Sequence, residues 1–73
     1  MTGYIKNILA NKKFGFIEEP ATKIQYFFHM QDYKGNWDEL VEDFDTLGPG
    51  IVELEFDIVK SPKGPRAGNV KKT

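Results

Sequence analysis

Hydrophobic and acidic residues alternate without interruption from residue 52 to residue 58. The apolar positions are Val52, Leu54, Phe56 and Ile58, and the acidic positions between them are Glu53, Glu55 and Asp57. Successive side chains of a β-strand point to opposite faces. The pattern therefore predicts a strand with one face in the core and the other in water.

Three further strands are expected earlier in the chain, over residues 4–9, 14–18 and 24–30. A polar turn over residues 10–13 joins the first two, and Pro20 interrupts the ladder before the third because proline lacks an N–H donor. Alternation then assigns the side chains to faces. In the strand over residues 14–18, Phe14 and Phe16 share one face and Gly15 and Ile17 the other. In the strand over residues 24–30, Phe27 and His29 share one face and Tyr26 and Phe28 the other.

Residues 31–50 have a different pattern, with apolar residues three, one and three positions apart. These residues are Trp37, Leu40, Val41 and Phe44. The spacing predicts about one or two helical turns with an acidic outer face. After the alternating strand, residues 61–65 form a turn-rich loop and residues 67–71 a short closing strand. Five short strands predict an antiparallel sheet, and closing it into a barrel would remove its edges.

Length and composition narrow the class of protein. With 73 residues and no cysteine, we expect one domain over residues 1–73 that is held together by packing alone. No apolar run is long enough for a membrane-spanning helix or a signal peptide, so we expect a soluble, cytoplasmic protein and no membrane partner. We also expect a monomer.

The net charge is only −1, but the charges are segregated along the chain. Residues 1–13 and 60–73 carry lysine or arginine and no acid, whereas residues 38–45 carry five carboxylates and no base. Basic ends beside aromatic strands favour a polyanionic partner.

The sequence has too few catalytic and metal-binding side chains to support an enzyme or a metal site. Ser61 is the only serine and His29 the only histidine, so a catalytic triad would need one chance pairing. One histidine without cysteine cannot anchor a typical zinc site. The carboxylates of residues 38–45 lack the alternation and central glycine of an EF-hand. We therefore expect no catalytic residues, no metal and no cofactor.

Aromatic rings beside lysines favour single-stranded nucleic acid. Exposed rings stack with bases, and neighbouring lysines attract the phosphates. The competing interpretation is that Phe14, Phe16 and Phe27 are ordinary core residues. Against it, Gly15 offers no side chain for packing between two of the rings, and Lys12 and Lys13 adjoin them. The polar His29 ring on the face of Phe27 also indicates exposure.

The segments KKFGFIEE (residues 12–19) and YFFHM (residues 26–30) resemble the two ribonucleoprotein motifs of bacterial cold-shock proteins, in the family's order and spacing. The resemblance continues at Thr2-Gly3 and over residues 56–70, and so covers most of the chain. It implies a five-stranded OB-fold barrel that binds single-stranded RNA or DNA as an RNA chaperone or a regulator of transcription or translation. Carried over residue by residue, it implies nucleic-acid contacts at Lys6, Lys12, Phe14, Phe16, Phe27, His29, Phe44 and Lys63.

The chain departs from the family pattern at several positions. Asn7-Ile8 replaces Trp-Phe on the first strand, Met30 replaces a ring, and Lys13 replaces a glycine. Fewer stacking rings predict weaker binding. The segment 34–53, between strands three and four, is longer than usual and brings in Trp37, which we interpret as a structural cap over one barrel end. The alternative function is protein interaction, with an acidic insertion over residues 34–48 docking a partner.

Overall fold

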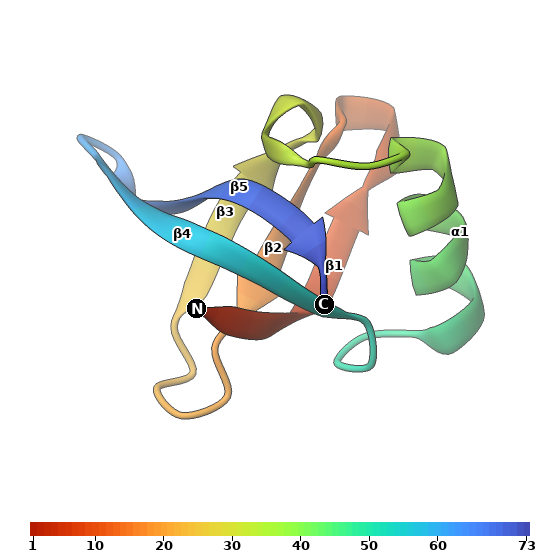
Figure 1. The fold of residues 1–73 in the computed structure, drawn as a ribbon, viewed down its shortest axis with the longest axis horizontal. Coiled ribbons are helices and arrows are strands. Elements are labelled where there is room, and N and C mark those ends of the chain that lie inside the picture. The colour runs from red at the N-terminus through yellow and green to blue at the C-terminus, as the bar shows by residue number, and fades with distance from the viewer.

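The computed structural model describes all residues, 1–73, as a barrel of five strands with one α-helix (Figure 1). The strands are β1 (Thr2–Leu9), β2 (Phe14–Glu18), β3 (Gln25–His29), β4 (Glu53–Ser61) and β5 (Gly64–Lys72). Helix α1 (Trp37–Leu47) lies between β3 and β4 in the sequence, and two short 3₁₀ turns cover Ala10–Lys12 and Met30–Asp32. No helix is long and apolar enough to cross a membrane.

The strands close in the order β1-β2-β3-β5-β4, which confirms the predicted five-stranded barrel. Four of the five junctions are antiparallel, whereas β3 and β5 meet in parallel at the pair Phe27 and Arg66. The sequence predicts an antiparallel barrel, and the single parallel junction between β3 and β5 is the one exception to that pattern. The intervening α1 and β4 return the chain to β3 in its original direction, and the closure leaves no free sheet edge.

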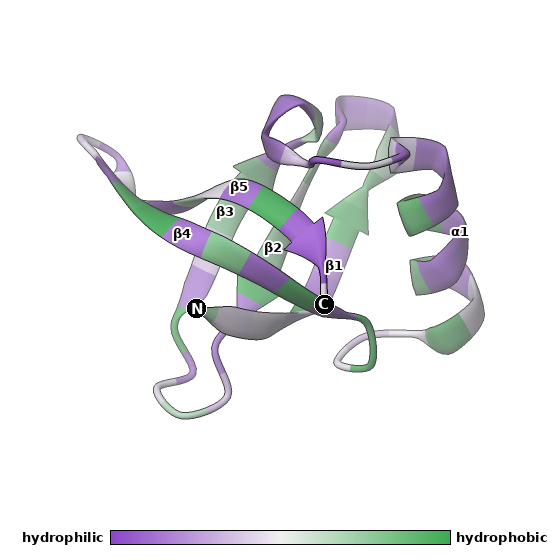
Figure 2. Ribbon diagram, viewed as in Figure 1, coloured by the Kyte–Doolittle hydropathy of each residue, from purple (hydrophilic) through white to green (hydrophobic).

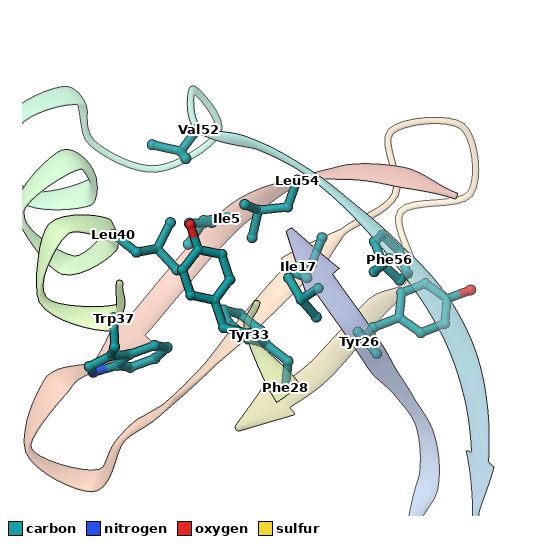
Figure 3. Close-up of a cluster of buried hydrophobic side chains, with 12 residues drawn as sticks. Ile5, Ile17, Tyr26, Phe28, Tyr33, Trp37, Leu40, Val52, Leu54 and Phe56 are labelled. Atoms are coloured by element: carbon teal, nitrogen blue, oxygen red, sulfur yellow. The ribbon is translucent and has the colours of Figure 1, made fainter. Parts of the chain in front are cut away.

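The core is one cluster of 12 buried side chains drawn from every strand and from α1 (Figure 3). Alternation predicted which residues of β2 and β3 enter it, because Ile17, Tyr26 and Phe28 are buried. Bands of hydrophobic and hydrophilic residues alternate along β4 in Figure 2, and Leu54 and Phe56 are buried there. The predicted core face of β4 is thus confirmed as far as Phe56.

Beyond Phe56 the structure differs from the prediction. Ile58 was expected in the core and is 45% exposed. The β4–β5 pairing shifts register between Glu55 and Asp57, and the hairpin then extends away from the barrel (Figure 1). Pairing continues to Ser61 and Gly64, so the predicted loop over residues 61–65 is a tight turn. The alternation of apolar and acidic residues does not show at which residue a hairpin extends beyond the barrel.

Helix α1 closes one end of the barrel. Trp37 and Leu40 are buried and point from α1 toward Tyr33 and the barrel interior (Figure 3). The Asn36 side chain accepts a hydrogen bond from the N–H of Glu39 and so caps the helix start. The helix is longer than the one or two turns predicted, with 11 residues, and it ends at Gly48, whose φ of 84° suits glycine. The expected structural cap is present.

The carboxyl end of β5 is tied to α1 by charge. Lys72 pairs with Asp43 and lies 3.6 Å from Glu39. The hydrogen bond from Lys72 to Asp43 raises the pKa of the Lys72 ammonium, although partial desolvation opposes the shift. Burial raises the pKa of the nearby Tyr33 phenol, and the positive charge of Lys72 opposes that shift. Part of the acidic segment is therefore neutralised within the fold.

Candidate nucleic-acid interface

The outer surface of β2 and β3 carries four ring side chains, which together form the aromatic face: Phe14, Phe16, Phe27 and His29. All four are half-buried, and the strands pair Phe14 with His29 and Phe16 with Phe27. The residues between and beside them that enter the core are Ile17, Tyr26 and Phe28, all of which are buried. Alternation therefore predicted the composition of this face correctly.

The three phenylalanine rings of the aromatic face pack on one another. The ring centroids are 5.2 Å apart for Phe14 and Phe27, 5.9 Å for Phe14 and Phe16, and 6.0 Å for Phe16 and Phe27. None of the three belongs to the buried core cluster. Such a patch of rings leaves π-surface open to stacking by bases. The interpretation of these rings as ordinary core residues is thus not supported.

Gly15 lies beneath the aromatic face at a point of close packing. A Cβ there would lie 2.8 Å from the Asn7 carbonyl oxygen and 3.0 Å from the Phe28 ring. Only glycine allows β1 and the core ring to approach β2 this closely. Gly15 thus lets the rings on either side of it project outward while the strand stays against the core.

His29 is held by the turn that follows β3. Its Nδ1 accepts a hydrogen bond from the N–H of Gln31 at 3.2 Å, and its own N–H donates to Asp32 Oδ2 at 3.0 Å. With Nδ1 accepting, the neutral ring carries its proton on Nε2, where it can donate to a ligand. The imidazole is therefore fixed in orientation beside Phe14.

Lys6 and Lys12 flank the aromatic face from β1 and from the turn that follows it. Both are exposed, and neither forms an ion pair within the protein. The β1–β2 register shifts between Ile5 and Asn7, so Lys6 is the extra residue of a bulge. The N–H of Met30 donates to the carbonyl of Lys13 at 2.8 Å, which holds this turn beside the end of β3.

Lys13 itself adopts a left-handed backbone conformation, with φ of 61° and ψ of 39°. This conformation favours glycine, which is the residue that the family pattern has at this position. Its cost for a lysine is of the order of 1–2 kcal/mol. Lys13 thus adds a positive charge near the aromatic face and lowers the stability of the fold.

Lys63 and Phe44 lie away from the centre of the aromatic face. Lys63 is exposed at the tip of the β4–β5 hairpin and lines a pocket of about 370 Å³ that Phe27 also lines. Phe44 lies on α1, is half-buried against the core cluster, and makes no ring contact with the aromatic face. The predicted contact of Phe44 with nucleic acid stays a prediction.

Sequence reasoning did not single out Arg66. Strand pairing aligns Asn7, Phe16, Phe27 and Arg66 in one row across β1, β2, β3 and β5. The guanidinium carbon of Arg66 lies 5.7 Å from the centroid of the Phe27 ring, a cation–π contact. No local pattern marks Arg66, because it stands in a segment rich in glycine and proline and reaches the face only through the parallel junction.

The family model of the 'Cold-shock' DNA-binding domain matches residues 1–73. The chain belongs to the cold-shock domain family. It is 38% identical over 69 residues to the "Cold shock-like protein" of Aquifex aeolicus (strain VF5), an alignment that covers 94% of this chain and 89% of that protein. It is 39% identical over 70 residues to the "Cold shock-like protein CspB" of Yersinia pestis, which covers 96% of this chain and 90% of that protein.

A third relative is the "Cold shock-like protein CspI" of Escherichia coli (strain K12), which is 37% identical over 70 residues, covering 96% of this chain and 90% of that protein. Cold-shock domains bind single-stranded nucleic acid and form a non-catalytic family. In this cold-shock domain, the residue that replaces the family's strand-one tryptophan, Asn7, is exposed at the end of the row of Phe16 and Phe27.

Proposed function

We propose that this cold-shock domain binds single-stranded RNA or DNA on its aromatic face and acts as an RNA chaperone or as a regulator of transcription or translation. It would do so as a single domain over residues 1–73 that acts as a cytoplasmic monomer. The observation that carries the proposal is the packing of three half-exposed rings outside a core that is filled by other residues. A surface of this kind is costly to leave in water and has the shape and chemistry to stack bases.

Roles follow from position. Phe14, Phe16, Phe27 and His29 would stack with bases, since their rings are partly open on one surface. Lys6, Lys12 and Lys63 would contact phosphates, because each is exposed and free of an internal ion pair. Phe44 packs against the core from α1 and has no ring contact with the aromatic face, so we assign it no role in the proposed binding.

The structure gives no support to the alternative of a protein-docking insertion. Trp37 and Leu40 are buried against the barrel, which leaves Leu47, 54% exposed, as the one largely exposed bulky apolar side chain of this segment. Asp43 and Glu39 are engaged by Lys72. We therefore propose no protein partner for residues 34–48.

The test is alanine substitution of each phenylalanine ring, with affinity and stability measured separately. Phe14→Ala, Phe16→Ala and Phe27→Ala should each weaken binding of a fluorescently labelled pyrimidine-rich strand by about 1–3 kcal/mol in anisotropy titrations. Each should cost less stability in urea unfolding than the roughly 3–5 kcal/mol of a buried phenylalanine.

Leu40→Ala is the matched control, because Leu40 is fully buried at the α1 end. It should lower stability and leave the affinity of the folded protein unchanged. If the three ring variants lose stability as Leu40→Ala does and keep their affinity, the rings are structural and the proposed function is wrong.

A further inference from the structure

Arg66 is held in one orientation at the edge of the aromatic face. One guanidinium nitrogen, Nη2, donates to Asp32 Oδ2 at 2.5 Å, and the same carboxylate oxygen accepts the N–H of His29 at 3.0 Å. The ring of Phe27 lies against the guanidinium. Asp32 and Phe27 thus fix the plane of the group while the Arg66 side chain remains 37% exposed.

The pocket beside Phe27 has an unusual balance of hydrogen-bonding groups. Its lining residues are Phe27, Ser61, Lys63, Gly64, Pro65 and Arg66. They include two cationic side chains and a hydroxyl but no carboxylate, and Pro65 has no N–H. The volume of about 370 Å³ is within the range of pockets that bind small molecules. The pocket therefore offers one aromatic wall and several donors, and it suits a flat ligand rich in acceptors.

Guanine is the base that matches this arrangement. Its N7 and O6 are adjacent acceptors, and two N–H groups of one guanidinium bind both at once. Adenine has an amino donor in place of O6, so its donor would face the donors of the arginine. Uracil and thymine offer no such adjacent pair of acceptors on that edge, and cytosine presents an amino group there. Because Asp32 occupies one N–H, the other guanidinium donors remain free.

We propose that Arg66 selects guanine at a base subsite between Phe27 and the β4–β5 hairpin, with Asp32 as its positioning residue. The inference rests on the proposed function, since it assigns base selectivity to one end of the same surface. Arg66 ends the row that Asn7 begins. The chain therefore lacks a ring at one end of its binding row and has a group able to read a base edge at the other.

The experiment uses seven-nucleotide DNA strands of thymidine with one central substitution, titrated by fluorescence anisotropy. The central base is guanine, hypoxanthine, 7-deazaguanine or adenine, and an all-thymidine strand is the reference. Hypoxanthine keeps N7 and O6, whereas 7-deazaguanine lacks N7. Strands with guanine and hypoxanthine should bind with equal affinity, roughly fivefold or more tighter than the strand with adenine. The affinity of the 7-deazaguanine strand should lie between those of the guanine and adenine strands.

Variants assign the preference to its residues. Arg66→Lys keeps the charge but loses the forked donors, so it should abolish the guanine preference and largely retain affinity for all-thymidine strands. Asp32→Asn should lower the preference by loosening the guanidinium. Lys63→Gln is the matched control from the same pocket, and it should lower the affinity for every strand by the same factor. Circular dichroism confirms the folding of each variant.

Three results would overturn the inference. Equal affinity for guanine and adenine in the unmodified protein, with firm binding of the all-thymidine strand, would remove the subsite and leave the proposed function intact. A guanine preference that survives Arg66→Lys would show that another group reads the base. Failure of every strand to bind, all-thymidine included, would instead refute the proposed function and this inference with it.

Discussion

Asn7 is the exposed residue at the β1 end of the row that contains Phe16 and Phe27. An amide side chain offers a base hydrogen bonds but almost no stacking surface. The neighbouring Phe16 is half-buried, and the bulge at Lys6 turns Asn7 to the same side of the sheet as that ring. The row therefore has an open position where one more ring could continue the stack.

Restoring that ring should tighten binding. Asn7→Trp is expected to raise affinity for a pyrimidine-rich strand by up to one stacking contribution, about 1–3 kcal/mol, measured by anisotropy titration. Thr46→Trp, which places the same ring on the exposed surface of α1, is the control and should change nothing. Equal affinities for Asn7→Trp and the unmodified protein would mean that β1 does not line the binding site.

At the scale of elements, α1 covers one end of the core and lies outside the aromatic face. Trp37 is buried with an edge-to-face contact to Phe28, at 5.9 Å between ring centroids. In Figure 1, α1 lies at the opposite end of the long axis from the tip of the β4–β5 hairpin. A ring that lies inside the core cannot replace the one missing at Asn7.

Trp37 fluorescence tests the role of α1. The emission should be blue-shifted and should change little when a saturating oligonucleotide is added, because the indole contacts Phe28 and not the bases. Leu40→Ala should cost about 2–5 kcal/mol in urea unfolding, since it leaves a cavity between α1 and the barrel. Strong, saturable quenching of a red-shifted emission would place α1 in the binding site.

The contact between α1 and the end of β5 should weaken at alkaline pH. The pKa of Lys72 and that of Tyr33 are both raised in the folded protein above their ordinary values of 10.5 and 10.0, so both groups hold their protons more tightly when folded. Lys72 and Tyr33 in their protonated forms contribute to the free energy of unfolding. This contribution is fully present below pH 10 and is lost as the pH rises through the folded pKa values.

Urea unfolding midpoints between pH 7 and pH 11.5 measure this effect. Lys72→Met should destabilise the protein at pH 7 by at most about 1 kcal/mol, because the ion pair is partly exposed, and the difference from the unmodified protein should shrink above pH 10.5. Lys71→Met, the neighbouring lysine without an ion pair, should not show this convergence. A constant difference over the whole range would mean that the pairing does not contribute.

At the scale of the whole molecule, the sequence predicts what depends on local alternation. The positions of β2 and β3, the inward set with Ile17 and Phe28, and the outward aromatic face all follow from a period of two residues. The parallel junction of Phe27 with Arg66 could not be predicted in this way. It depends on which strands become neighbours when the barrel closes, and that is set by the chain as a whole.

In the proposed function, single-stranded nucleic acid binds across β2 and β3. A ¹H–¹⁵N NMR titration with a short pyrimidine-rich strand tests it most directly, because it reports every backbone amide at once. We expect the amides of β2, β3 and the β4–β5 turn to shift in a saturable way while those of α1 stay in place. Shifts confined to α1 and residues 34–48, or no shifts at all, would contradict it.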